Sequence, residues 1–383
     1  MKILWVNPSF LDYRIPVYEK INKLTNGNFF LIYARSRVPE RVYKKITDAI
    51  GDHAIGLSNE LTIDIPGTGR FSDTDVKIPY QPGLSKCISK VNADIIIAEG
   101  FFQWTPIALL KAKLKRKKIL IAYERTSHAE RFSPKWRILY RKLISKFIDG
   151  YSVNGKLTKD YLIELGVKEK FIFTGGMSAD SEKLADMVNL FSIDEKIKLK
   201  NELLINNGIT YLYVGKIDER KGIIYLLNAW IKHIEKYPND ILLLVGDGLF
   251  YNKYVSEYSN FSSIKLLGNI DYDFIYRYYA IADVFIIPTL EDNWSLVVPE
   301  AMACGLPIAC SIYNGCYPEL IHEGINGKLF DPFDNNTILE TLSYFHGKDL
   351  KRMGNESINI EKKYNADSVA LNIYNSCLLL VGL

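Results

Sequence analysis

Short apolar runs of strand length alternate with helically patterned segments along most of this chain of 383 residues. Five such runs fall in the first half, at residues 2–7, 29–34, 94–98, 118–123 and 150–154. Segments with the spacing of a helix lie between several of them, at residues 16–24, 104–114 and 135–147. Strands that alternate with helices predict βαβ units and therefore a mainly parallel sheet.

A second alternation follows a polar, helically patterned stretch at residues 178–208. Its strand-like runs lie at residues 210–215, 241–246, 264–268, 284–288 and 308–310. We therefore predict an α/β protein with two doubly wound, Rossmann-like domains at residues 1–175 and 209–363, joined by a connection at 176–208. Ligands of such sheets bind at the carboxyl ends of the strands. Residues 36–90 are patterned too irregularly to predict an order of elements.

Charge is distributed unequally between the two halves. Residues 1–175 contain 30 Lys and Arg and 17 Asp and Glu, a net charge of +13, whereas the remainder contains 18 and 27, a net charge of −9. Basic runs lie at residues 111–118 and 125–146. Such runs are typical of solvated helix faces, and the alternative is attraction to an anionic membrane surface. We predict no nucleic-acid partner, because no known binding module is visible.

The cysteine content favours a reducing cytoplasm. Five cysteines, an odd number at wide spacing, argue against a disulfide framework. Cys304, Cys310 and Cys316 recur every six residues but fall on a predicted helix end, a strand and a loop, so we interpret them as packing residues rather than metal ligands. No apolar run approaches ~18 residues, so no transmembrane helix is predicted.

The most informative stretch follows the strand-like run at residues 284–288. It carries the carboxylates Glu291, Asp292 and Glu300, and it has helical character from Leu296 until Gly305. The N-terminus of a helix suits an anionic ligand such as a diphosphate. Carboxylates would repel that ligand, so we predict that they accept hydrogen bonds from the hydroxyls of a sugar.

Two motifs carry a resemblance to a known family. Asp292 and Glu300, followed by Ala-Met-Ala-Cys-Gly-Leu-Pro, resemble the Glu-x7-Glu motif of the family 4 retaining glycosyltransferases of the GT-B fold. The first acid is Asp here, and Glu291, one position earlier, is the alternative for that role. Residues 213–222 resemble the family's Gly-Arg-x4-Lys-Gly segment, with Lys216 in the Arg position and Lys221 in the Lys position. The similarity runs from residue 211 to about residue 341.

The resemblance implies that the two domains face a deep cleft and that a C-terminal helix at residues 364–383 packs back on the first domain. It implies catalytic roles for Lys216, Lys221, Asp292, His128 and Glu124. It implies donor contacts for Glu300, Asn293, Trp294, Ser295, Leu296, Val297, Gly268, Ile270, Arg220 and Gly246. The acceptor-site candidates are Arg14, Glu99 and Trp104, which lie near the ends of predicted strands in the first domain.

No metal or other cofactor is predicted. The pairs Asp271-Tyr-Asp273 and Asp73-Thr-Asp75 match the Asp-x-Asp signature of metal-dependent GT-A enzymes, but such matches are common. Asp271 precedes a predicted helix, so capping explains it better than a cation does.

The resemblance implies the transfer of a hexosyl or N-acetylhexosaminyl unit, with retention of configuration, from a nucleotide sugar, most typically a UDP-sugar. The acceptor would be a hydroxyl of a glycan or lipid-linked glycan in cell-surface polysaccharide biosynthesis. The predicted location is the cytoplasm, with peripheral binding to the inner face of the cell membrane as a further option. The alternatives are a sugar-nucleotide 2-epimerase on the same fold and a non-catalytic sugar-nucleotide-binding protein.

Overall fold

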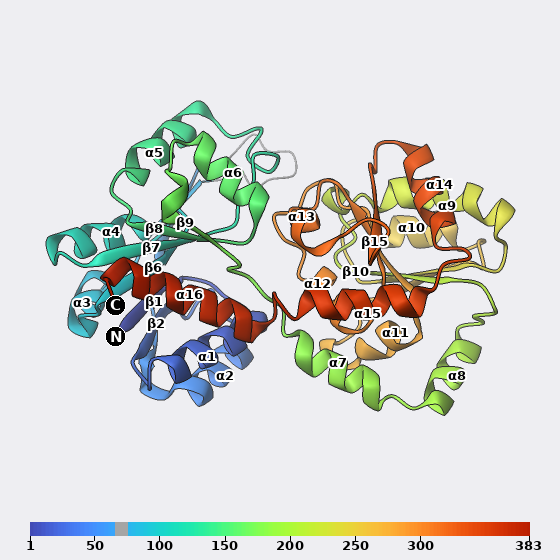
Figure 1. Ribbon diagram of the computed structural model, residues 1–383, viewed down its shortest axis with the longest axis horizontal. Coiled ribbons are helices and arrows are strands. Elements are labelled where there is room, and N and C mark those ends of the chain that lie inside the picture. Colours follow the sequence, from blue (N-terminus) through green and yellow to red (C-terminus); the bar gives the residue numbers. More distant parts are fainter. Residues whose placement is uncertain (66–75) are drawn as a thin grey trace. The chain divides into compact units, whose positions relative to one another are not determined.

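The computed structural model describes residues 1–65 and 76–383, and the chain divides into two compact units (Figure 1). Unit 1 consists of Met1–Asp180 together with Ala366–Leu383, and unit 2 consists of Ser181–Asn365. Each unit is built around a parallel sheet with helices on its faces, which confirms the α/β prediction.

Unit 1 contains a sheet of seven parallel strands in the order β3-β2-β1-β6-β7-β8-β9. The strands are β1 (Ile3–Val6), β2 (Phe29–Ala34), β3 (Ala54–Leu57), β6 (Ile95–Glu99), β7 (Lys118–Tyr123), β8 (Gly150–Val153) and β9 (Ile172–Thr174). An antiparallel pair, β4 (Leu61–Ile65) and β5 (Val76–Tyr80), stands apart from this sheet. The helices are α1 (Ile15–Leu24), α2 (Glu40–Ile50), α3 (Leu84–Val91), α4 (Thr105–Leu114), α5 (Lys135–Ser145), α6 (Lys156–Glu164) and α16 (Ala366–Val381).

Successive residues of each central strand belong to two different cores, because side chains alternate across a sheet. Ile3 and Trp5 of β1 face a core completed by α1, α2 and α16, whereas Leu4 and Val6 face one completed by α3, α4 and α6. Figure 1 shows α16 beside α1, so the C-terminal residues complete one side of unit 1. Because both faces of this sheet are buried, the sequences of these strands are continuous apolar runs.

Unit 2 contains six parallel strands in the order β12-β11-β10-β13-β14-β15. They are β10 (Thr210–Val214), β11 (Ile241–Val245), β12 (Ile264–Gly268), β13 (Val284–Ile287), β14 (Ile308–Ser311) and β15 (Gly327–Phe330). The helices are α7 (Ser181–Leu190), α8 (Ile193–Glu202), α9 (Ile223–Lys236), α10 (Tyr251–Tyr258), α11 (Tyr276–Ile281), α12 (Val297–Ala303), α13 (Tyr317–Leu320), α14 (Asn335–Tyr344) and α15 (Leu350–Glu361). The polar segment expected as a connection supplies α7 and α8, which pack on α11 and α12 of this unit.

Each sheet has one point where the strand order reverses. In unit 1 this point lies between β1 and β6, and in unit 2 it lies between β10 and β13. Loops that leave the sheet in opposite directions open a crevice at such a point, which is where open α/β sheets bind ligands. No helix in the described part of the chain is long and apolar enough to cross a bilayer.

Candidate functional site

A pocket of about 580 Å³ opens at the carboxyl ends of β10, β11 and β12 in unit 2. Its walls are formed mainly by residues that follow these strands, including Gly215, Lys216, Asp218, Gly246, Asp247, Gly248, Asn269 and Ile270. Three predicted site residues, Lys216, Gly246 and Ile270, are therefore brought to one pocket by the sheet.

Glycine is required where the ends of β10 and β11 approach each other. A Cβ on Gly246 would lie 1.9 Å from the carbonyl oxygen of Gly215, and the φ of Gly246 is +138°. The N–H of Gly246 donates to the carbonyl of Gly268 (2.8 Å), which joins the ends of β11 and β12. Any side chain at residue 246 would force these loops apart and reshape the pocket.

Lys221 and Asp292 form an ion pair beside this pocket. Lys221 Nζ lies 2.5 Å from Asp292 Oδ2, and both side chains are largely buried. The backbone N–H of Lys221 also donates to the carboxylate of Asp218, which lines the pocket. Burial acts to raise the pKa of Asp292, but the neighbouring ammonium of Lys221 holds that pKa below its usual value. Asp292 is therefore an anion at neutral pH and sits next to a cation.

The loop that carries Asp292 is fixed from several directions. The carbonyl of Arg220 accepts hydrogen bonds from the backbone of Leu290 (2.8 Å) and from Thr289 Oγ1 (3.2 Å), so it links this loop to that of Lys221. Asp292 Oδ1 accepts from the backbone N–H of Trp294 (3.2 Å). Trp294 is buried and its ring lies 6.1 Å from that of Tyr364.

The loop then leads directly into α12. The backbone N–H of Ser295 donates to Asn314 Oδ1 (3.3 Å), and Leu296 is the N-cap residue before Val297. The carbonyl oxygen of Asn293 lies very close to Gly315. A Cβ on residue 315 would be only 2.0 Å from that oxygen. The predicted residues 293–297 therefore lie in the short segment that runs from Asp292 to the first residue of α12.

Glu300 lies on α12, where it is buried and accepts two tyrosine hydrogen bonds. The hydroxyl of Tyr272 donates to Oε1 (3.1 Å), and that of Tyr279 donates to Oε2 (3.3 Å). Tyr272 follows the pocket residue Ile270 by two positions, so the carboxylate is tied to the loop that borders the pocket. Glu291, the alternative first acid, is also buried, and it is Asp292 that pairs with Lys221.

Unit 1 has its own pocket, of about 300 Å³, where the loops after β1, β6 and β7 meet at the switch point. Three predicted residues, Arg14, Glu99 and Glu124, line it. Glu99 accepts hydrogen bonds from Trp5 Nε1 and Asn7 Nδ2, both at 3.0 Å. Burial raises the pKa of Glu99, while the nearby Arg14 opposes the rise.

The other two predicted residues of unit 1 lie elsewhere. Trp104 is buried in the core, and its indole N–H donates to Glu60 (2.8 Å). The neighbouring Gln103 lines the pocket instead. His128 lies three residues beyond Arg125, which lines the pocket, and its carbonyl accepts a hydrogen bond from Arg131.

Sequence reasoning missed three arginines that line the unit 1 pocket, Arg125, Arg137 and Arg141. Arg137 and Arg141 are the buried residues of α5, while Trp136, Leu139 and Leu143 on the same helix are exposed. This pattern inverts that of an ordinary surface helix. The four-residue spacing of the arginines beside apolar positions is the signal that could have identified them.

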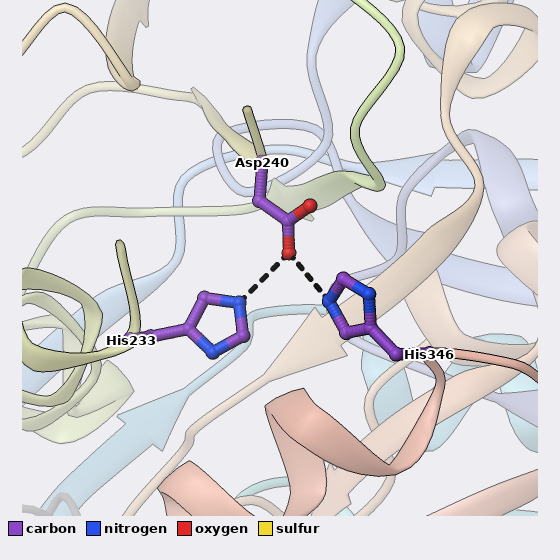
Figure 2. A group of neighbouring side chains, drawn as sticks. All are labelled: His233, Asp240 and His346. Atoms are coloured by element: carbon purple, nitrogen blue, oxygen red, sulfur yellow. Dashed lines mark hydrogen bonds and ion pairs between the residues drawn. The ribbon is translucent and has the colours of Figure 1, made fainter. Parts of the chain in front are cut away.

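One group of side chains with metal-ligand chemistry occurs among the described residues, and Figure 2 shows it. The Nε2 atoms of His233 and His346 each lie 2.8 Å from Oδ2 of Asp240, and Oδ1 accepts from the backbone of Ile209 (2.8 Å). Nδ1 of His233 is buried without a hydrogen-bond partner in the described structure. A metal-bound His233 would carry its proton on Nδ1, which would then need an acceptor. The geometry favours hydrogen bonds between Asp240 and the two histidines. These bonds join α9, which carries His233, to the residue before β11 and to the segment after α14.

The sequence contains two Asp-x-Asp pairs that were considered as metal ligands, and the structure describes one of them. Asp271 caps the 3₁₀ turn Tyr272–Phe274, where its side chain accepts from the backbone of Asp273 (3.0 Å), as the capping interpretation predicted. Asp73 and Asp75 lie outside the described residues.

Residues 208–346 match a protein family described as glycosyl transferases group 1. An uncharacterised glycosyltransferase of Methanocaldococcus jannaschii is 28% identical over 211 residues, which cover 51% of this chain and 52% of that protein. An alpha-monoglucosyldiacylglycerol synthase of Acholeplasma laidlawii is 30% identical over 142 residues, which cover 35% of this chain and 34% of that protein. The chain therefore aligns with only about half, or less, of the length of these relatives.

Solved structures of similar fold cover almost the whole chain. HepE of Anabaena in complex with UDP has a TM-score of 0.73 and 17% identity, and the match covers 98% of this chain and 99% of that one. A sucrose-phosphate synthase of Thermosynechococcus elongatus has a TM-score of 0.63 and 17% identity, with 97% of both chains covered. The likeness shows the fold, which is GT-B with two Rossmann-like domains, as predicted.

Proposed function

We propose that this chain transfers a sugar from a nucleotide-sugar donor to a hydroxyl of an acceptor, because residues 208–346 match the family of glycosyl transferases group 1. The observation that carries the proposal is the pocket of unit 2, with Lys216 in its wall and the Lys221–Asp292 pair beside it. Two cations next to a carboxylate suit a ligand that joins a diphosphate to a sugar. A UDP-sugar is the proposed donor, and the structures of HepE with UDP support this choice.

Each side chain then has a defined task. Lys216 and Lys221 bind the diphosphate, Asp292 accepts hydrogen bonds from the transferred sugar, and Glu300 accepts from the ribose hydroxyls. The backbone near Gly246, Gly268 and Ile270 contacts the base.

The reaction proposed is a front-face substitution that retains configuration at the anomeric carbon. The bond from the anomeric carbon to the phosphate oxygen breaks, and a bond to the acceptor oxygen forms on the same face. The acceptor proton passes to the leaving phosphate oxygen, so no covalent enzyme intermediate is formed. Lys216 and Lys221 stabilise the negative charge that develops on the leaving group, which is electrostatic catalysis. We propose that no metal ion is required for this step.

The experiment that tests the proposal uses the full chain and a panel of nucleotide sugars. UDP-glucose and UDP-N-acetylglucosamine should raise the melting temperature, because a ligand that binds only the folded state stabilises it. GDP-mannose and ADP-glucose should raise it less. Addition of a lipid-glycan extract should release UDP from the active donor, and excess EDTA should leave that rate unchanged.

Other outcomes of this experiment identify the rival functions. Isomerisation of the donor sugar without an acceptor would indicate a 2-epimerase. A thermal shift without turnover on any extract would indicate a non-catalytic binding protein. If no nucleotide sugar shifts the melting temperature, the proposed donor site is wrong.

We also propose that unit 1 docks on an anionic lipid surface through α5. Trp136, Leu139 and Leu143 are 50%, 69% and 54% exposed, and their spacing places them on one side of the helix. The exposed Lys135 and Lys142 flank them. An exposed apolar stripe beside cations is typical of helices that lie in the membrane interface. The name of the Acholeplasma relative, a diacylglycerol glycoside synthase, supports a lipid partner.

The basic run at residues 111–118, for which the sequence left membrane attraction open as the alternative to a solvated helix face, is partly neutralised within unit 1. Lys113 and Lys118 lie 2.8 and 3.5 Å from Asp149, and Lys117 lies 3.7 Å from Asp94. These pairs reduce the charge available to an external surface. The α5 stripe is therefore the better-supported docking surface.

Replacement of Trp136, Leu139 and Leu143 by serine should lower binding to vesicles rich in phosphatidylglycerol by about tenfold or more. Burying each such side chain contributes roughly 1.5–3 kcal/mol when the burial is complete. Vesicle flotation measures the loss, and serine at the exposed Leu110 and Leu114 of α4 is the matched control. Equal flotation of both variants would contradict docking through α5.

A further inference from the structure

The loops after β11 and β12 bring side chains without an assigned role to the pocket of unit 2. The sheet order from one edge inward is β12-β11-β10-β13. Lys216, proposed for the diphosphate, follows β10, and Asp292, proposed for the sugar, follows β13. Neighbouring strands lie about 4.8 Å apart, so the loops after β11 and β12 lie on the side of β10 away from β13. They therefore border the nucleoside of the proposed donor.

Leu249 is an apolar side chain that a fixed backbone holds in water. It lines the pocket and is 86% exposed. Single exposed leucines are common on protein surfaces, but the backbone beyond this one is tied down. The N–H of Phe250 donates to the carbonyl of Ile217 (3.1 Å), and the N–H of Tyr251 donates to the carbonyl of Gly248 (3.1 Å). Covering the apolar surface of a ligand would therefore be favourable for Leu249.

Asn269 is a polar side chain on the same pocket with unused hydrogen-bonding capacity. It is exposed, it lines the pocket, and its amide makes no hydrogen bond among the described residues. Its neighbours are fixed, because the carbonyl of Gly268 accepts from Gly246 (2.8 Å) and Asp271 caps the turn that follows. The amide offers a donor, Nδ2, next to an acceptor, Oδ1. This pair is complementary to the edge of uracil, where N3–H lies between two carbonyl oxygens.

The other residues that line the pocket from β11 onward are mostly apolar. Val245, Ile270 and Ile275 are among them, and Val245 and Ile275 are buried. The carboxylate of Asp247 accepts from the backbone N–H of Gly248 (2.6 Å), so it is engaged within its own loop. Hydrogen bonds are stronger in apolar surroundings than in water. A flat ring with a polar edge is therefore suited to this part of the pocket.

We propose that Asn269 and Leu249 select the base of the donor. Oδ1 of Asn269 accepts a hydrogen bond from N3–H of uracil, and Nδ2 donates to a neighbouring carbonyl oxygen of the ring. Leu249 covers one face of that ring. This inference rests on the proposed transferase function, and it adds two side chains that determine which nucleotide sugar is taken.

The variant Asn269→Asp tests the polar contact. A carboxylate only accepts hydrogen bonds, so it repels a carbonyl oxygen of uracil, whereas it can accept from the adjacent N1–H and N2 amino group of guanine. Titration calorimetry with UDP and GDP gives the ratio of their dissociation constants. The unaltered chain should favour UDP, and the variant should shift the ratio toward GDP by about tenfold or more.

The ratio removes the general repulsion between the new charge and the diphosphate, which UDP and GDP share. The matched control is Asn260→Asp. Asn260 is also exposed and lies shortly before β12, at the opposite end of that strand from Asn269. This control should leave the ratio as it is in the unaltered chain.

The variant Leu249→Ser tests the apolar contact. It should weaken binding of UDP and of uridine by the same factor, about fivefold, because the contact is with the ring and not with the phosphates. Leu190→Ser is the matched control, since Leu190 is 82% exposed at the end of α7. Leu249 and Asn269 are both exposed, so their variants should keep the melting temperature of the unaltered chain.

The inference is wrong if Asn269→Asp leaves the ratio unchanged, if Leu249→Ser binds UDP as tightly as the unaltered chain, or if its loss appears with UDP but not with uridine. Tighter binding of GDP than of UDP by the unaltered chain would also contradict it. These results leave the transferase proposal standing. Failure of every nucleotide to bind the unaltered chain would instead refute the proposed function itself, so the two failures are distinguishable.

Discussion

Replacing Lys221 by methionine is expected to lower kcat about 10²–10³-fold with a UDP-sugar at saturation. In the proposed reaction the bond that breaks leaves negative charge on the diphosphate, and a fixed cation beside that charge is worth roughly 3–4 kcal/mol in the transition state. Lys221 is fixed because its ammonium pairs with Asp292 and its backbone N–H donates to Asp218. Initial rates of UDP release at saturating donor measure the effect.

Removing Lys221 also leaves the buried Asp292 without its cation, so stability must be separated from catalysis. The ion pair lowers the pKa of Asp292, so it stabilises the fold at neutral pH, and this contribution is lost as the pH falls through the lowered pKa. The double variant Lys221→Met with Asp292→Asn removes both charges and should recover much of the melting temperature. Its kcat should stay low, and a recovered kcat would show that Lys221 acts only on stability.

The sheets could be predicted from the sequence because their central strands are buried on both faces. Residues 95–98 and 241–245 are continuous apolar runs for that reason, and each coincides with a strand of the structure. The motif residues around Lys221 and Asp292 follow such strands directly. Their approach to one pocket is a consequence of parallel strands ending at the same edge.

Elements at the margin of unit 1 could not be predicted in the same way. β3 is only partly buried along its length, and β4 exposes Leu61 and Ile63. Neither strand has the continuous apolar run of a central strand, and the alternation of apolar and polar residues in β4 extends over only five residues. Pairing with a neighbouring strand determines them, β3 with β2 and β4 with β5, and local pattern does not identify that partner.

Long-range contacts also decided the role of individual residues. Trp104 was a plausible wall of a binding site, but Glu60, 44 positions away, accepts its indole N–H, and the ring lies in the core. Arg137 and Arg141 read as part of a solvated basic helix, yet they are its buried face. Only the way in which α5 packs against the core of unit 1, which the sequence does not state, reverses that interpretation.

The second large effect is expected at Glu300, where the variant Glu300→Gln should weaken UDP binding about 30-fold. A carboxylate can accept from both ribose hydroxyls, whereas an amide offers only one acceptor atom. The loss of one charge-assisted hydrogen bond costs about 2 kcal/mol. Isothermal titration with UDP measures the change, and uridine, which keeps the ribose, should lose affinity by a similar factor.

Glu300 is also the acceptor for two tyrosine hydroxyls, so a positioning effect must be distinguished from direct contact. Tyr272→Phe and Tyr279→Phe each remove one of these hydrogen bonds and leave the carboxylate in place. If Glu300 binds ribose directly, each phenylalanine variant should weaken UDP binding by only a few-fold, because it perturbs orientation alone. If the phenylalanine variants match Glu300→Gln, the carboxylate acts by holding the loop that follows Ile270. An unchanged affinity in Glu300→Gln would place the ribose elsewhere and would remove α12 from the donor site.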